Sequence, residues 1–175
     1  MSFIQGYDPE TLREIVDPVR CQERLGEIEG LRSLPDLLER VWLLKVLDRL
    51  DEALDVAEHA VREARMAGTR KDLLRARILH ATVLQYRGSY AAAIAEITTC
   101  AAEAEGQGWP GIAAFAHQHR GKTYFDVGDY EAARADFKRE LFLRQDAGAT
   151  EQQLQSTLHA VDAADRRRVE SSIAV

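Results

Sequence analysis

A short motif that recurs every 40 residues is the strongest constraint on what this chain can fold into. Its clearest copy is GDYEAA at 128–133, and weaker copies are RGSYAAA at 87–93 and DRLDEA at 48–53. The alanines that align across the copies stand at 53, 93 and 133. A fixed period of this length is typical of arrays of helical hairpins. Each copy lies between two segments with helical spacing of apolar residues, so we interpret it as the turn of a hairpin.

The composition agrees with an all-α protein. Of the 175 residues 46% are hydrophobic but only 7% are aromatic, and the chain has 11 glycines and 4 prolines. Few helix breakers and many small apolar residues favour helices that pack on one another. We therefore expect an N-terminal helical cap or arm at 1–33, three hairpins at 34–70, 71–110 and 111–148, and a C-terminal capping helix with a tail at 149–175.

The first 33 residues fall outside the repeat. Asp8-Pro9 and Asp17-Pro18 each place an acidic N-cap before a proline suited to the first helical position. This pattern predicts a short helix near 9–16 and a second near 18–29, which Gly30 ends. The segment either covers the apolar face of the first hairpin or forms a loosely attached arm that binds a partner or a second subunit.

Small residues recur where the two helices of each hairpin are expected to cross. Alignment on the 40-residue period places them on both helices: Val41, Ala81 and Gly121 on the first, and Ala53, Ala93 and Ala133 on the second. Small side chains at both positions allow two helix backbones to approach closely. Larger residues fill the layer beside them: Leu44, Leu84 and Tyr124 on the first helices, and Ala57, Ile97 and Phe137 on the second.

These positions resemble the tetratricopeptide repeat (TPR) family, in its long form of about 40 residues. The resemblance is carried by Gly121, Tyr124, Gly128, Tyr130, Ala133 and Phe137 in the third hairpin, by Ala81, Gly88, Tyr90, Ala93 and Ile97 in the second, and by Ala53 in the first. It covers about 34–148. It implies a right-handed α-solenoid of three hairpins with capping helices at both ends, a fold that serves many unrelated functions.

Two features depart from the family pattern. Glu140 stands where Ala60 and Cys100 supply the usual small residue. We therefore expect looser or different packing between the third hairpin and the last helix, with the carboxylate either exposed or paired. A position that is commonly Leu carries Arg40, His80 and Arg120 instead. One interpretation is that these basic side chains form a basic ladder that binds an anion. The more common arrangement is that such side chains pair with acidic residues such as Asp36 and Glu39 and extend into solvent.

The sequence contains no recognisable catalytic or cofactor motif. It lacks a phosphate-binding glycine loop, a nucleophile elbow and a dinucleotide fingerprint, so we expect a protein that is not an enzyme and holds no cofactor. A formal net charge of −6 argues against nucleic acid as the partner. Two separate cysteines, the absence of a signal-peptide pattern and the absence of a long apolar run favour a cytoplasmic protein with free thiols and no membrane contact.

Two nearby histidines could suggest a metal site, but their spacing on a helix argues against it. His117 and His119 are two residues apart, so on a helix their side chains point in nearly opposite directions. A metal site needs three or four converging ligands, and no acidic residue stands at the matching position. We therefore expect no metal.

The resemblance implies a binding surface on the first helices of the hairpins, which in the family line a concave groove for peptides or helices. The positions of this chain that correspond to it are Trp42, Lys45, Arg75, Thr82, Gln85 and Tyr86, then Phe115, Gln118, His119, Lys122 and Asp126, and on the last helix Gln155, His159 and Asp162. A mixture of aromatic, hydrogen-bonding and charged groups suits peptide recognition. The residues that some members use to bind a terminal carboxylate are not matched.

Three functions agree with these observations. The first is an adaptor or scaffold that binds an unidentified protein or peptide through this face. The second is a bacterial regulatory sensor for a signalling peptide or small ligand. The third is a structural module that forms a homodimer by covering the exposed ends of a short repeat array.

Overall fold

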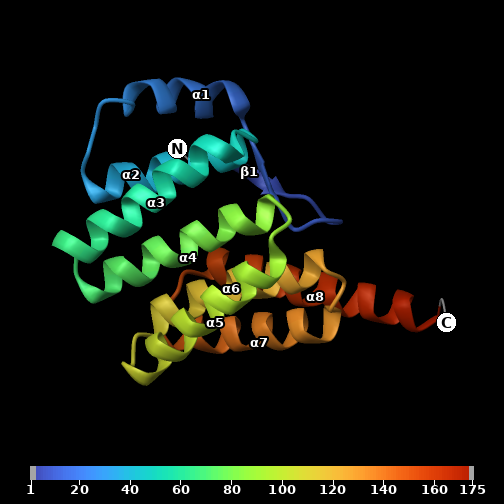
Figure 1. Ribbon diagram of the computed structural model, residues 1–175. Coiled ribbons are helices and arrows are strands. Elements are labelled where there is room, and N and C mark those ends of the chain that lie inside the picture. The colour runs from blue at the N-terminus through green and yellow to red at the C-terminus, as the bar shows by residue number, and fades with distance from the viewer. Residues whose placement is uncertain (1–2, 174–175) are drawn as a thin grey trace. The chain divides into compact units, whose positions relative to one another are not determined.

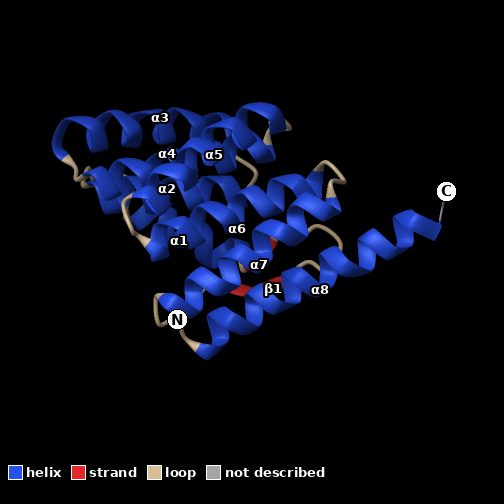
Figure 2. Ribbon diagram, turned by 90° about the horizontal axis from the view of Figure 1, so that it is seen from below, coloured by secondary structure: helices blue, strands red, loops and turns tan. Residues whose placement is uncertain are grey.

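The computed structural model describes residues 3–173, and most of this part of the chain is helical, which confirms the all-α prediction (Figure 1). The helices are α1 (Pro18–Glu27), α2 (Leu34–Val46), α3 (Leu50–Ala67), α4 (Arg70–Tyr86), α5 (Tyr90–Gly106), α6 (Pro110–Asp126), α7 (Tyr130–Asp146) and α8 (Glu151–Ile173). Strands β1 (Ile4–Tyr7) and β2 (Glu14–Val16) form a small antiparallel pair (Figure 2). In the described part of the chain, no helix is both long and apolar enough to cross a bilayer.

The described residues divide into two compact units. Unit 1 consists of the chain up to Asp8 together with Arg13–Ala92, and unit 2 consists of Pro9–Leu12 together with the chain from Ala93 onward. The division therefore falls within the first turn of α5. The connection between β1 and β2 is split in the same way, because residues 9–12 belong to unit 2.

In unit 1, helices α2, α3 and α4 pack on one another and α1 packs on α2. Apolar spacings of three and four place one side of each helix in a shared core. This core contains Cys21, Leu25, Ile28, Val41, Leu43, Leu44, Ala53, Ala57, Leu79 and Val83. The small residues expected at the crossings of this unit, Val41, Ala53 and Ala81, are fully buried.

In unit 2, α6 packs on α7 and α7 packs on α8. The core contains Leu12, Phe125, Ala133, Phe137, Ala160, Val161, Ala163 and Ala164. At the crossing of α6 and α7, a Cβ atom added to Gly121 would lie 2.6 Å from the ring of Phe137, which is fully buried. The prediction of a close approach at Gly121 is therefore confirmed.

The recurrent motif forms the same turn at each copy. Asp48, Gly88 and Gly128 all have a left-handed backbone, with φ values of 60°, 80° and 81°. The Gly128 N–H donates to the carbonyl of Phe125 (3.1 Å), and the following N–H donates to the carbonyl of Tyr124 (3.0 Å). The same pair of hydrogen bonds closes the other two turns. This is the Schellman arrangement that ends a helix. The same arrangement also ends α5 at Gly108 and α7 at Gly148.

Gly128→Ala is expected to lower the free energy of unfolding by about 1 kcal/mol, because a residue with a Cβ atom is disfavoured in the left-handed region. Chemical denaturation followed by circular dichroism measures this change. Gly106→Ala serves as the control, since Gly106 ends α5 without a positive φ and with open space around its Cα. The account is contradicted if the two variants lose equal stability.

The prediction of a helix near 9–16 is wrong. Residues 14–16 form strand β2 instead, which pairs with β1, and residues 9–13 connect the two strands. The Asp8 N–H donates to the carbonyl of Arg13 (2.8 Å), and Leu12 has a φ of 57°. A helix of eight residues is marginal by itself, whereas the connection between the two strands buries Leu12 to 6% exposure. The second expected helix is confirmed as α1, and the carboxylate of Asp17 accepts hydrogen bonds from the first free N–H groups.

Candidate functional site

Helices α2 and α4 of unit 1 carry the first group of predicted binding residues. The Lys45 ammonium lies 4.7 Å from the ring centre of Tyr86, so these two residues are brought together. Lys45 and Gln85 are buried, and Trp42 is half-buried. Thr82 is also buried, and its hydroxyl donates to the Leu79 carbonyl of the same helix (2.7 Å). Arg75 is exposed and its guanidinium lies 3.8 Å from Asp72.

The chain's own N-terminal segment covers this face. We call the part of it that belongs to unit 1 the arm, defined as Phe3–Asp8 and Arg13–Val16. The hydroxyl of Tyr86 donates to the carboxylate of Glu14 (2.9 Å), and the Lys45 ammonium lies 3.9 Å from the same carboxylate. The Arg13 guanidinium lies 4.4 Å from the ring centre of Tyr86. Residues that sequence reasoning assigned to a peptide groove therefore contact an extended segment of the same chain.

An aromatic contact fixes the other end of the arm. The ring centres of Phe3 and Trp42 are 6.2 Å apart with planes inclined at 46°, a favourable tilted arrangement. Phe3 and Val16 both pack against the core of unit 1. A two-stranded ribbon is marginal by itself, so these contacts hold the arm in place.

The second group of predicted binding residues lies in unit 2, on α6 and α8. On α6, Phe115 and His119 form an edge-to-face pair with ring centres 4.5 Å apart. His119 and Lys122 are buried, while Gln118 and Asp126 are half-buried. On α8, by contrast, the predicted residues are all exposed, namely Gln155, His159 and Asp162.

Glu140 is buried and paired. It is 1% exposed; its carboxylate accepts hydrogen bonds from Arg144 (2.7 Å) and from the hydroxyl of Thr157 on α8 (3.0 Å). Of the two outcomes foreseen for this residue, pairing is correct and exposure is wrong. Burial raises the pKa of Glu140 above its ordinary value, against the opposing charge of Arg144, the two hydrogen bonds and the charge of Lys122.

The raised pKa of Glu140 has a consequence for stability. The unfolded chain loses this proton at a lower pH than the folded chain does, so the contribution of Glu140 to stability falls as pH rises towards the folded pKa. Glu140→Gln removes this loss. We expect the stability of the variant relative to wild type to increase with pH, measured by urea denaturation at several pH values between about 4 and 8.

Glu131→Gln is the matched control, because it removes one carboxylate from the exposed surface of the same helix. If the difference between Glu140→Gln and wild type were the same at every pH, the assignment of the raised pKa to burial would be contradicted.

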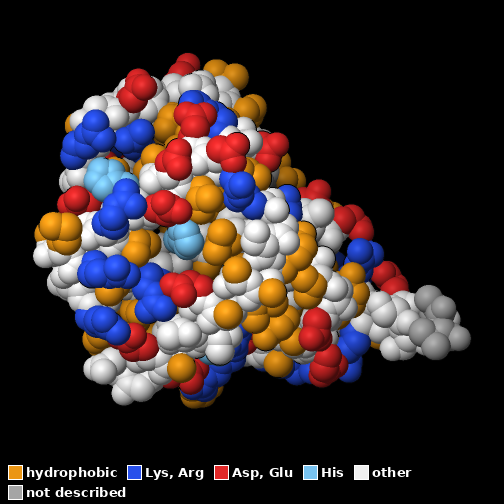
Figure 3. Space-filling view, in the orientation of Figure 1, with side chains coloured by type: hydrophobic (Ala, Val, Ile, Leu, Met, Phe, Trp, Pro, Cys, Tyr) orange, Lys and Arg blue, Asp and Glu red, His pale blue; other side chains and the backbone are white. Residues whose placement is uncertain are grey.

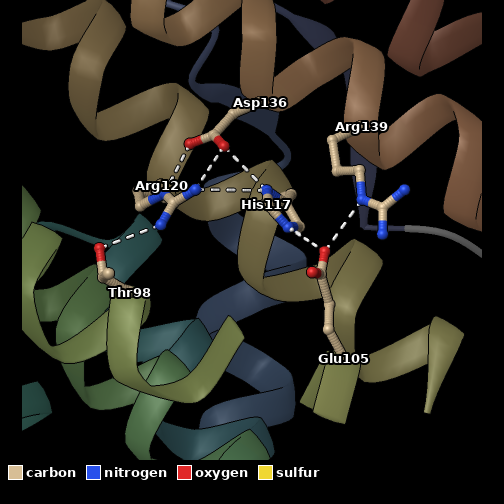
Figure 4. Close-up of polar contacts among 6 residues, drawn as sticks. All are labelled: Thr98, Glu105, His117, Arg120, Asp136 and Arg139. Carbon is tan, nitrogen blue, oxygen red and sulfur yellow. Dashed lines mark hydrogen bonds and ion pairs between the residues drawn. The ribbon is translucent and has the colours of Figure 1, made fainter. Parts of the chain in front are cut away.

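A polar network connects α5, α6 and α7 within unit 2 (Figure 4). His117 lies between two carboxylates, with its Nδ1 atom 2.8 Å from Asp136 and its Nε2 atom 2.9 Å from Glu105. Arg120 donates two hydrogen bonds to Asp136 (2.8 and 2.7 Å), and Arg139 donates one to Glu105 (2.9 Å). Arg120 also donates to the hydroxyl of Thr98 (3.0 Å).

Charge compensation dominates the electrostatics of this network. Burial acts most strongly on Asp136 and raises the pKa of its carboxyl, but the hydrogen bonds and charges of Arg120 and His117 outweigh it, so the pKa lies below its ordinary value. The hydrogen bond from Arg139, followed by that from His117 and opposed by burial, lowers the pKa of Glu105. The carboxylates of Asp136 and Glu105 thus each lie against an arginine, and these contacts link α6 with α7 and α5 with α7.

No group of three or more potential metal ligands occurs among the described residues. In particular, His117 takes part in the polar network while His119 packs on Phe115, so the two histidines lie in different surroundings. Cys21 and Cys100 are both buried, and neither forms a disulfide with another described residue.

Sequence reasoning missed the arm residues and most of the polar network. Of the network residues, Arg120 was considered as part of the basic ladder with Arg40 and His80, and His117 was considered only as half of a possible metal-binding pair. The partner of Arg120 is Asp136, while Glu39 pairs with Arg24 instead. One signal in the sequence could have identified this pair. Arg120 and Asp136 are 16 residues apart on either side of the turn of one helix hairpin, and a hairpin brings such residues together. For the arm, residues 4–7 (Ile-Gln-Gly-Tyr) do not alternate between apolar and polar, so no strand pattern was present there.

Comparisons with known proteins inform the fold only. No protein-family model matches the chain, and no curated protein does. Among solved structures, the crystal structure of BtubC (BKLC) from P. vanneervenii is similar, with a TM-score of 0.56 and 16% sequence identity. The match covers 87% of this chain and 72% of that chain. At this identity the likeness shows a shared arrangement of helices and says nothing of function.

Proposed function

We propose that this chain is a non-enzymatic adaptor of the tetratricopeptide-repeat type, which binds an extended peptide of a protein partner through the first helices of its hairpins. The matching turns at Asp48, Gly88 and Gly128, spaced 40 residues apart, and the close crossing at Gly121 support the repeat type. The binding function rests on one observation: an extended segment already occupies the face of α2 and α4 that carries Trp42, Lys45 and Tyr86.

The arm defines the chemistry of the peptide that this face accepts. An aromatic side chain packs on Trp42, as Phe3 does. A carboxylate accepts the hydrogen bond of Tyr86 and compensates the buried charge of Lys45, as Glu14 does. Aromatic anchors and buried charge pairs are the contacts that dominate the energy of such interfaces. A partner peptide with an aromatic and an acidic residue can therefore replace the arm.

The test uses the full chain with a weakened arm, Phe3→Ala combined with Glu14→Ala, and a fluorescent peptide with the sequence of residues 3–16. We expect fluorescence anisotropy to detect tighter binding to this variant than to wild type, because the competing segment of the same chain is weakened. Adding Trp42→Ala or Tyr86→Ala should reduce the affinity by about tenfold or more, as truncation of an anchor does.

Phe142→Ala, which removes an exposed aromatic side chain from α7, is the matched control and should leave the affinity unchanged. Circular dichroism establishes that each variant is folded. Equal binding of the peptide to wild type and to all variants would rule out the α2 and α4 face as the binding surface.

A further inference from the structure

A cleft of about 480 Å³ lies in unit 1 on α2, α3 and the segment before α2. Three guanidinium groups and a histidine line it, together with two carboxylates and two apolar side chains: Arg32, Arg40, His59, Arg62, Asp55, Glu63, Val56 and Met66. None of these residues contributes to the arm contacts described above. Figure 3 shows several Lys and Arg side chains, with a histidine and some Asp and Glu side chains among them, over the region of α2, α3 and α4.

Some of these charges are compensated within the chain. His59 lies 3.5 Å from Glu63, and Arg62 lies 3.9 Å from Glu58, a residue outside the cleft. Arg40 is different. Its Nε atom is buried and has no hydrogen-bond partner among the described residues. Since almost all buried polar groups are hydrogen-bonded, a buried N–H group without a partner requires an explanation.

The 40-residue period supplies that explanation. Arg40 and Arg120 are two repeats apart, and so are Val56 and Asp136. In unit 2 the carboxylate of Asp136 accepts two hydrogen bonds from Arg120. In unit 1 the residue at the place of Asp136 is Val56, which lines the same cleft as Arg40. The guanidinium is thus retained at this position of the repeat, whereas the carboxylate that compensates it is not.

We propose that this cleft is an oxyanion-binding site, in which a carboxylate or phosphate group of a ligand takes the place of the missing Asp136-type carboxylate against Arg40. A guanidinium presents parallel N–H groups that match two oxygens of either anion. Arg32 stands at the same cleft and adds positive charge for the ligand. The site is separate from the arm-covered face, so it does not depend on the function proposed above.

The test follows the Nε–Hε signal of Arg40 by nuclear magnetic resonance in the full chain, with Arg40→Lys to assign it. Sodium phosphate and sodium acetate are added in separate titrations at constant ionic strength, with chloride as the reference. We expect a saturable shift of this signal with at least one of the two anions. A stronger response to phosphate identifies a phosphorylated ligand, and an equal or stronger response to acetate identifies a carboxylate.

The variant Val56→Asp rebuilds the internal pair and should weaken the anion affinity by about tenfold or more, an effect on the scale of one charge-assisted hydrogen bond. Val56→Asn is its matched control, because asparagine has the shape of aspartate without the charge. This variant should keep the anion-induced shift of the Arg40 signal. Arg40→Gln should abolish anion binding. The anion that binds should therefore raise the melting temperature of the wild-type protein but not that of this variant. The proposal is overturned if neither anion gives a saturable shift, or if Val56→Asp responds as wild type does.

Discussion

Replacing Asp136 by alanine lowers the free energy of unfolding by about 3–5 kcal/mol, the range found when one partner of a buried ion pair is removed. The Asp136 side chain is 7% exposed, and the side chains that face it, His117 and Arg120, are 9% and 17% exposed. Without the carboxylate, Arg120 keeps a positive charge in surroundings that water reaches poorly. Urea denaturation followed by circular dichroism measures the loss.

Asp165→Ala is the matched control, since it also removes an aspartate that pairs with an arginine. The Arg134–Asp165 pair is more exposed, with side chains at 26% and 38%, and its loss should cost less than about 1 kcal/mol. If both variants lost equal stability, burial would not be what gives Asp136 its importance.

The lowered pKa of Asp136 adds a pH dependence with a definite sign. A carboxyl whose folded pKa lies below its unfolded value stabilises the fold at all pH values above the unfolded value, near about 4, and this contribution is lost as pH falls through the folded pKa. The difference in stability between wild type and Asp136→Ala should therefore shrink below about pH 4. A constant difference down to about pH 2 would contradict the assignment.

Gly121→Val is expected to destabilise the protein by about 1–3 kcal/mol, the cost of overfilling a packed core. An added Cβ atom would lie 2.6 Å from the ring of Phe137 and 3.2 Å from the Cβ atom of Asp136, so α6 and α7 must separate. Thermal and chemical denaturation report the change in stability. Gly111→Val is the matched control, because Gly111 is exposed on the same helix with no atom within 4 Å of an added Cβ.

A second substitution tests whether Phe137 is the group that Gly121 accommodates. In the double variant Gly121→Val, Phe137→Ala, the added side chain enters space that the ring has left. The combined loss should then be smaller than the sum of the two single losses, as is typical of residues in contact. Additive losses would mean that the introduced valine side chain clashes with another part of α7.

The candidate site could be predicted only in part. The positions on the first helices follow from the helical period, because side chains three and four residues apart share a face. Their surroundings do not follow from it. The contacts of Lys45 and Tyr86 with Glu14 join residues that are far apart along the chain, and the turn before Glu14 has no period that aligns it with the hairpins. The unpartnered Nε atom of Arg40, within the described part of the chain, likewise became visible only from its burial.

The sequence by itself determined the helices, their turns and the close crossing at Gly121. These features depend on local backbone preferences and on a repeated spacing of residues, and both can be read from the sequence alone. Only the tertiary structure decided that residues 9–16 form no helix, that Glu140 is buried, and that Arg120 is compensated while the Nε atom of Arg40 has no partner among the described residues. Each of these depends on which distant group supplies a hydrogen bond or excludes water, and local sequence does not contain that information.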